Sequence, residues 1–419
     1  MPHTIVLYED ARWSSFLPLV YLRPLYQLIC GTGTLQERVQ ALHAHEAPDA
    51  VLMLSARPAL QAVLEEETPL AVNASPSGPA LFLNGRGVWK RLPPDPSTGA
   101  WVGLCGDEVA CIGADAPLAA RLTTSVLLDA DALADALAGL PRHDVAEHVD
   151  LMAWPWELIH RHLRAMHEPF PGQTPRGRHD GQVDAGSHLL NPEAITIEAG
   201  ARVKPGVVID AETGPVWIGP GVRVLPHVYI QGPAYIGAHS VLQPSAVVRD
   251  GTYIGPVCKV GGEIDASIIQ GYSNKQHDGF LGHSYIGSWV NIAADCINSD
   301  LKNTYGTVRM PINGHKVETG EQFVGLIMGD HSKTAINVSF PTGSVIGCCS
   351  SIIVTIPPQF VPSFAWINQE GLDRYDVDRG VVLARRVMAR RERTLTPAAE
   401  ALFRHAAVVA QAHEVWEGG

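Results

Sequence analysis

Every sixth residue from Ile218 to Val260 is aliphatic, without exception. A period of six suits neither an amphipathic helix nor a simple alternating strand. It is typical of the left-handed parallel β-helix, in which short strands form the sides of a triangular prism and the aliphatic residues stack inside it. The glycines and prolines that follow many of these positions permit tight corners. The residues in phase are Ile218, Val224, Ile230, Ile236, Leu242, Val248, Ile254 and Val260.

The hexad pattern, shifted in phase by a short insertion at 212–216, predicts a prism over residues 191–357, which Pro357 and Pro358 are expected to end. Two segments, 265–284 and 298–322, break the phase and are rich in polar residues. We therefore expect both of them to project from the prism.

The first 150 residues follow another pattern, in which short apolar runs alternate with segments whose apolar residues recur three and four apart. This alternation predicts an α/β domain over residues 1–150 with a largely parallel sheet. Residues 151–190 are expected to be a helical linker and arm, and residues 358–419 a C-terminal extension with helices that cover the end of the prism. The expected strands are 4–8, 50–54 and 80–83, and the expected helices are 34–45 and 129–140.

The composition limits the partners of the chain. A formal net charge of -12 argues against nucleic acid or an anionic membrane surface as a partner. No apolar run is long enough to span a bilayer, and no N-terminal signal segment is visible. The 7 cysteines follow neither a disulfide framework nor a paired zinc motif. A cytoplasmic protein is the expectation.

Residues 273–292 (SNKQHDGFLGHSYIGSWVNI) carry the most specific motif. They resemble the acetyltransferase domain of the bifunctional N-acetylglucosamine-1-phosphate uridyltransferase/glucosamine-1-phosphate acetyltransferase family, where a lysine precedes a catalytic histidine and a Leu-Gly pair follows. The resemblance implies that His277 is the general base and that Asn291 binds the sugar. Lys275 and Asn274 are expected near the sugar phosphate. Phe280 stands where the family has tyrosine, so one hydroxyl contact is missing.

Acyl transfer to an amine needs a base that takes a proton near neutral pH, and a free imidazole, with a pKa of about 6.5, suits this task. His331 and His283 are the alternatives to His277. Zinc held by His277 and His283 is another interpretation, but no third histidine is suitably placed, so we assign no metal to the prism. The acyl donor implied by the family is acetyl-CoA, which Lys333 and Ser332 are expected to contact.

Residues 16–38 (FLPLVYLRPLYQLICGTGTLQER) are similar to the signature of sugar nucleotidyltransferases. The glycine-rich phosphate loop of that family is absent, and Leu25 replaces its lysine. Arg86 lies where the family has a magnesium-binding aspartate. We expect Arg12, Arg23 and Arg86 to form an anion pocket; surface arginines on a degenerate scaffold are the alternative. Mg²⁺ is the metal that such a domain would use.

Segments 298–305 (NSDLKNTY), 328–333 (MGDHSK) and 361–366 (VPSFAW) resemble more closely a divergent branch of the bifunctional family, with an atypical nucleotidyltransferase-like domain before the prism. The resemblance implies a homotrimer that N-acetylates an amino-sugar 1-phosphate and transfers a nucleotide to it, giving a product like UDP-N-acetylglucosamine. Its small-molecule partners would be a sugar phosphate, a nucleotide and acetyl-CoA. The alternatives are an acyltransferase with a degenerate nucleotide-binding domain and a non-catalytic scaffold that binds sugar nucleotides.

Overall fold

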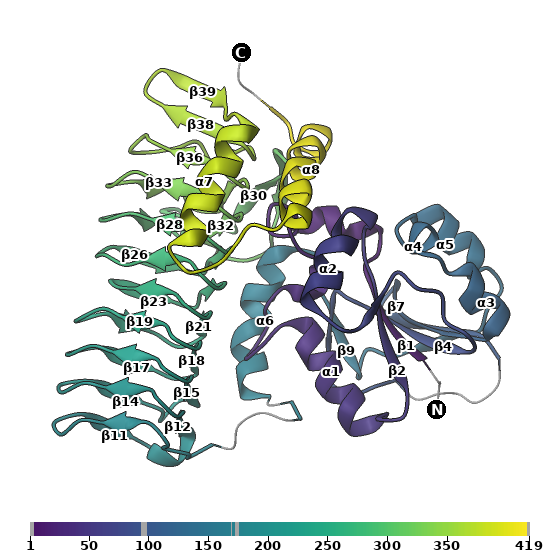
Figure 1. Ribbon diagram of the computed structural model, residues 1–419, viewed down its shortest axis with the longest axis horizontal. Coiled ribbons are helices and arrows are strands. Elements are labelled where there is room, and N and C mark those ends of the chain that lie inside the picture. Colours follow the sequence, from purple (N-terminus) through teal and green to yellow (C-terminus); the bar gives the residue numbers. More distant parts are fainter. Residues whose placement is uncertain (1–3, 94–98, 169, 172–175, 417–419) are drawn as a thin grey trace.

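The computed structural model describes residues 4–93, 99–168, 170–171 and 176–416. It shows an α/β domain, a long parallel β-helix and C-terminal helices (Figure 1). The β-helix forms a column along one side of the molecule, and helix α6 (Pro155–His167) stands between this column and the α/β domain (Figure 1). The fold class expected from the sequence is confirmed. Of the expected arm, residues 169 and 172–175 lie outside the described residues.

The sheet of the α/β domain is largely parallel, as expected, with one antiparallel strand among those described. Strand β1 (Thr4–Tyr8) pairs in parallel with β2 (Val51–Ser55) and with β4 (Ala80–Asn84), whereas β7 (Glu108–Ala114) runs antiparallel to β4. The expected strands are present, shifted by one residue at most. The other strands are β3 (Ala71–Val72), β5 (Gly87–Trp89), β6 (Trp101–Cys105), β8 (Arg142–Asp144) and β9 (Val149–Leu151).

Helix α1 (Leu35–Glu46) begins where its capping residues predict. The Thr34 hydroxyl accepts a hydrogen bond from the Glu37 backbone N–H, and the Glu37 carboxylate accepts one from the Thr34 N–H. The second expected helix, 129–140, is shorter in the structure, where α5 spans Ala130–Ala136. The other helices of the domain are α2 (Gln61–Glu67), α3 (Ala116–Arg121), α4 (Thr124–Leu127) and α5 (Ala130–Ala136).

Parallel sheets form the sides of the prism, and we name each by its first and last strands. The β10–β39 sheet contains β10 (Gln182–Val183), β13 (Arg202–Val203), β16 (Arg223–Val224), β19 (Val241–Leu242), β22 (Lys259–Val260), β25 (Asn274–Lys275), β28 (Asn291–Ile292), β33 (Lys333–Thr334), β36 (Ser351–Ile352), β38 (Ala365–Asn368) and the antiparallel β39 (Gly371–Arg374). The β11–β26 sheet contains β11 (His188–Leu190), β14 (Val208–Asp210), β17 (Tyr229–Gln231), β20 (Val247–Val248), β23 (Glu263–Asp265) and β26 (Phe280–Gly282).

The third side, the β12–β37 sheet, faces the α/β domain. It contains β12 (Ile195–Ile197), β15 (Val216–Ile218), β18 (Ala234–Ile236), β21 (Thr252–Ile254), β24 (Ile268–Ile269), β27 (Tyr285–Ile286), β32 (Leu326–Met328), β35 (Ser344–Ile346) and β37 (Phe360–Val361). Smaller pairs are β29 (Ile297–Asn298) with β34 (Ser339–Phe340) and β30 (Arg309–Ile312) with β31 (His315–Glu318).

The aliphatic residues of the repeat stack inside the prism as expected. Ile218, Ile236 and Ile254 are direct neighbours in successive strands, and each has no exposed surface. Many corner residues adopt positive φ, among them Tyr272 at 65° and Trp289 at 62°. The burial of these stacked aliphatic side chains is the main contribution to the stability of the prism.

The structure corrects two expectations about the limits of the repeat. Residues 265–284 do not project: they form prism strands in register with the coils before and after them, joined by shorter corners than in the regular repeat, and Lys275 takes an inward position. Pro357 and Pro358 do not end the prism, which continues through β37 and β38. The expected projection at 298–322 is present in part, as the β30–β31 hairpin.

The C-terminal helices α7 (Val377–Ala389) and α8 (Pro397–His413) join the prism to the α/β domain. The Thr396 hydroxyl donates to the Glu66 carboxylate at 2.7 Å, and the Glu414 carboxylate accepts from both Tyr21 and Ser363. The extension is therefore a brace between the domains. Among the described residues, no helix is long and apolar enough to cross a membrane.

Candidate functional site

A groove of about 440 Å³ lies on the β10–β39 sheet. Lys259, Asn274, Asn291 and Lys333 occupy the same register position on neighbouring strands, so their side chains form an outward row. Side chains alternate along a strand, and the next residue on each strand is buried in the prism. All of these outward residues line the groove.

His277 lies at the corner that follows β25 and lines the same groove. Its side chain is exposed. The structure therefore brings together Asn274, His277, Asn291 and Lys333, which the sequence analysis selected separately. The groove therefore offers an imidazole, amides and an ammonium group to one ligand.

Helix α7 and the segment after it form one wall of the groove. Arg390 and Arg391 line it, and the Arg391 guanidinium donates to the Asn274 amide oxygen at 3.0 Å. Arg393 donates to the Tyr272 hydroxyl at 3.0 Å. Tyr272 in turn stacks on Trp289, with ring centroids 4.2 Å apart. The groove thus has an aromatic floor beside its cationic wall.

The charged side chains that line the groove are positively charged. Its lining includes the cations Lys259, Lys333, Arg390 and Arg391, and no carboxylate among the described residues. None of these cations forms a salt bridge with a carboxylate in the described part of the chain. A cluster of unneutralised cations in a protein of net charge -12 favours an anionic ligand.

Three residues expected at this site lie elsewhere. Lys275 points into the prism and is 1% exposed, so it does not reach a substrate in the groove. Ser332 is also buried, where its hydroxyl donates to the Gly347 carbonyl and accepts from the Ser350 N–H. Phe280 belongs to the β11–β26 sheet, on another side of the prism. The expected contacts of these residues with substrate or coenzyme A are therefore corrected.

The alternative bases have other environments. His331 is buried against Phe403 of α8, and burial lowers the pKa of its imidazole well below the ordinary value. His283 lies at a different corner of the prism, where its Nδ1 is 2.9 Å from a carboxylate oxygen of Asp300. Of the candidate bases, His277 is the one in the groove.

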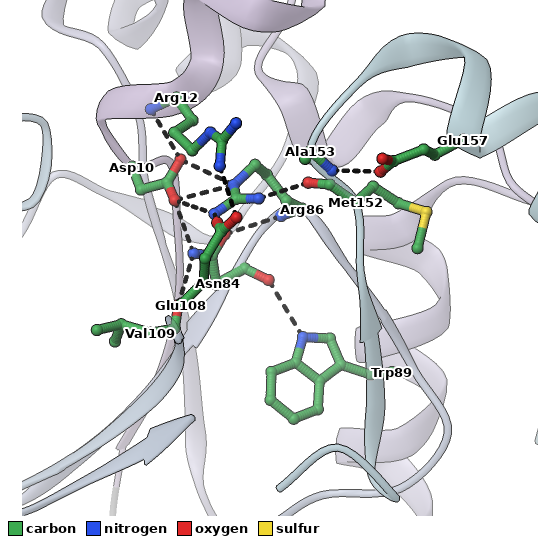
Figure 2. A network of polar contacts seen from close by, with 10 residues as sticks. All are labelled: Asp10, Arg12, Asn84, Arg86, Trp89, Glu108, Val109, Met152, Ala153 and Glu157. Carbon is green, nitrogen blue, oxygen red and sulfur yellow. Dashed lines mark hydrogen bonds and ion pairs between the residues drawn. The ribbon is translucent and has the colours of Figure 1, made fainter. Parts of the chain in front are cut away.

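The prediction of an anion pocket in the α/β domain is wrong. Arg86 is 2% exposed and its guanidinium binds the carboxylates of Asp10 and Glu108, at 2.8 and 2.5 Å (Figure 2). Arg12 binds Glu108 from the other side. Asn84 also donates to Asp10, at 2.9 Å. These side chains neutralise one another where phosphate oxygens were expected to bind.

Arg23 lies far from this network and binds the prism instead. Its guanidinium donates to Asp330 at 2.7 Å and to Ser288 at 3.3 Å, and it also contacts Gln270. The carboxylates of Asp10 and Glu108 do not fit a Mg²⁺ site, because arginine already holds them. Among the described residues, no group of three or more His, Cys, Asp or Glu side chains could hold a metal ion.

Some groove residues come from a distant part of the chain and were not predicted from the sequence. Arg390 and Arg391 follow α7, more than a hundred residues after Asn274. No local motif marks them, although the clustering of arginines near this helix was visible. Lys259 was detectable, because it precedes an inward valine by one position, as Asn291 precedes an inward isoleucine.

Comparison with known proteins identifies the domains. Residues 5–176 match the family model of sugar nucleotidyl transferase, and residues 215–250 match the bacterial transferase hexapeptide repeat. The chain therefore combines a sugar nucleotidyltransferase domain with a hexapeptide-repeat domain of the transferase kind, as the sequence motifs indicated.

Curated relatives are named as bifunctional proteins. The chain is similar to the bifunctional protein GlmU of Acidithiobacillus ferrooxidans, with 31% identity over 167 residues, which cover 39% of this chain and 33% of that protein. GlmU of Methanococcus vannielii is 34% identical over 119 residues, 28% of each chain. The bifunctional sugar-1-phosphate nucleotidylyltransferase/acetyltransferase of Sulfurisphaera tokodaii is 27% identical over 156 residues, 37% of each chain. The matches span about a third of the length of these relatives.

Proposed function

We propose that this protein transfers an acyl group from a coenzyme A thioester to the amine of a sugar phosphate, and that the groove on the β10–β39 sheet is the site. The observation that carries the proposal is the exposed His277 beside a row of unneutralised cations. Both substrates bear phosphate groups, which such cations bind. Acetyl-CoA and a glucosamine 1-phosphate-like acceptor are the specific substrates proposed; the Sulfurisphaera tokodaii relative is named for a sugar 1-phosphate and for acetyl transfer.

The reaction assigns a role to each group. His277 takes a proton from the acceptor ammonium, and the amine attacks the thioester carbonyl. The new C–N bond forms and the C–S bond breaks; the thiolate leaves and takes the second proton, which the nitrogen loses as the amide forms. Asn274 and Asn291 hold the acceptor, while Arg390, Arg391, Lys259 and Lys333 bind phosphate groups. Backbone N–H groups of the prism stabilise the oxyanion.

We propose a homotrimer in which the prism of a second copy covers the groove. Ile336 lines the groove and is 63% exposed, and Ile353 and Ile356 are also exposed, at 40% and 69%. Exposed aliphatic side chains beside a polar groove favour an interface between copies. A monomer mass in light scattering would contradict this assembly.

Nucleotidyl transfer by the α/β domain is the second candidate function, and the family match over residues 5–176 favours it. The ion pairs of Arg86 with Asp10 and Glu108 weigh against it, because they remove the charges that phosphoryl transfer needs. We therefore propose that acyl transfer is the main activity and that the α/β domain is degenerate as a catalyst.

Two assays separate these proposals. Free thiol is measured with acetyl-CoA and glucosamine 1-phosphate, against acetyl-CoA alone as the blank. Thiol release that depends on the acceptor supports acyl transfer; no release with any amino-sugar phosphate would favour the non-catalytic scaffold. Pyrophosphate is then measured with UTP, Mg²⁺ and the sugar phosphate. Its formation would restore nucleotidyl transfer as a second activity.

A further inference from the structure

Lys275 occupies an inward position of the prism that its neighbours on the same sheet fill with aliphatic side chains. It lies between Val260 and Ile292 in register and is 1% exposed. A buried ammonium group is costly, and a methionine or leucine would fill the same space without that cost. The presence of lysine at this position therefore needs a reason other than packing.

The contacts of the ammonium group indicate that reason. The Nζ atom of Lys275 donates to the backbone carbonyls of His277 at 2.5 Å and of Asp278 at 2.8 Å, and it lies 3.5 Å from that of Gly261 in the preceding coil. These carbonyls belong to two successive corners of the prism. The ammonium group thus joins the corner that carries His277 to the corner beneath it.

The corner beside the ammonium group follows a path that requires glycine at position 279. Gly279 has φ of +125°, and a Cβ atom there would lie 3.1 Å from the Lys275 Nζ atom and 2.2 Å from the Cys296 carbonyl oxygen. The same corner is tied to both neighbouring coils, by the Asp295 N–H to the Asp278 carbonyl and by the Glu263 N–H to the Gly279 carbonyl. A side chain at 279 would clash with the Cys296 carbonyl of the next coil, so the corner keeps this path beside the ammonium group only with glycine.

We infer that Lys275 is a positioning residue whose buried ammonium group fixes the main chain of the corner that presents His277 to the groove. The inference rests on the proposed acyl transfer. Lys275 touches no substrate; it acts through the backbone of His277. A displacement of about 1 Å in a catalytic group lowers turnover by about 100-fold, so loss of these hydrogen bonds affects kcat rather than substrate affinity.

The test compares Lys275→Met with Leu242→Met. Leu242 is an inward residue of the same sheet, two strands before Lys275, and it lies outside the groove lining. We expect Lys275→Met to lower kcat by about 10- to 100-fold with less than about a twofold change in KM for acetyl-CoA. Its urea midpoint should be no lower than that of Leu242→Met. A kcat equal to that of Leu242→Met, or a fall in urea midpoint that parallels the fall in kcat, would overturn the inference.

Hydrogen exchange tests the same inference without activity. In Lys275→Met, the amides of Asp295 and Glu263, which bond to the His277 corner, should exchange about tenfold faster than in the parent. Unchanged exchange would overturn the positioning role. If the parent itself releases no thiol while exchange becomes faster in Lys275→Met, the proposed function fails and the structural tie of Lys275 to this corner stands.

Discussion

Replacing Arg23 by alanine should weaken the attachment of the α/β domain to the prism by roughly 3 kcal/mol. The side chain of its partner Asp330 is 1% exposed, and that of Arg23 is 14% exposed. Without Arg23, the Asp330 carboxylate keeps the Ser288 N–H, at 2.6 Å, but loses the cation that neutralises it. Breaking a buried ion pair from one side costs about 3–5 kcal/mol, and we take the lower end because Ser288 still donates.

The assay is urea unfolding followed by circular dichroism, with Arg249→Ala as the matched control. Arg249 pairs with Glu263 at the surface, where the side chains are 45% and 38% exposed, so its loss should cost less than about 1 kcal/mol. Adding Asp330→Asn to Arg23→Ala should recover about 2 kcal/mol, because it removes the unpaired charge. If Arg23→Ala unfolds like Arg249→Ala, the buried pair does not contribute as described.

Three further results are expected. Ile236→Asp should lower the free energy of unfolding by about 4 kcal/mol, and with it the melting temperature, because Ile236 has no exposed surface. A variant that melts at the parent temperature would contradict the register. Burial lowers the pKa of His162 to about 3, so the unfolded chain alone binds its proton below about pH 6.5. The free energy of unfolding should therefore fall by roughly 1 kcal/mol for each unit that the pH is lowered from 6.5 to 3, and less steeply in His162→Gln. Equal pH slopes in the parent and the variant would contradict the effect of His162. Arg390→Ala combined with Arg391→Ala should raise KM for acetyl-CoA about tenfold with a smaller change in kcat, whereas a pure loss of kcat would exclude a binding role.

The hexad pattern predicted the prism because inward stacking imposes one residue type at a fixed period. It failed at residues 265–284, where shortened corners break the period of six and Lys275 takes an inward place. A test based on aliphatic residues alone cannot recognise a lysine whose charge is satisfied by backbone carbonyls. The same residue was assigned to the substrate for the same reason: a charged side chain in a motif is ordinarily expected to face solvent.

The site was predicted where it is local in sequence. Asn274, His277 and Asn291 lie on neighbouring coils, so the motif brought them together. Arg391 enters the groove through the packing of the C-terminal extension on the prism, which no spacing rule contains. The arginines of the α/β domain were grouped by resemblance to a phosphate site, and their actual partners depended on carboxylates such as Asp10 and Asp330 that only the fold brings near.

The most direct test of the account is the turnover of His277→Ala in the thiol-release assay, with coenzyme A affinity measured on the same preparation. The account predicts that kcat falls by about 10²- to 10⁴-fold, because the base is removed, while the Kd for coenzyme A changes by less than about threefold, because the cations of the groove remain. A His277→Ala protein that releases thiol at the parent rate would contradict the assignment of this groove as the site of acyl transfer.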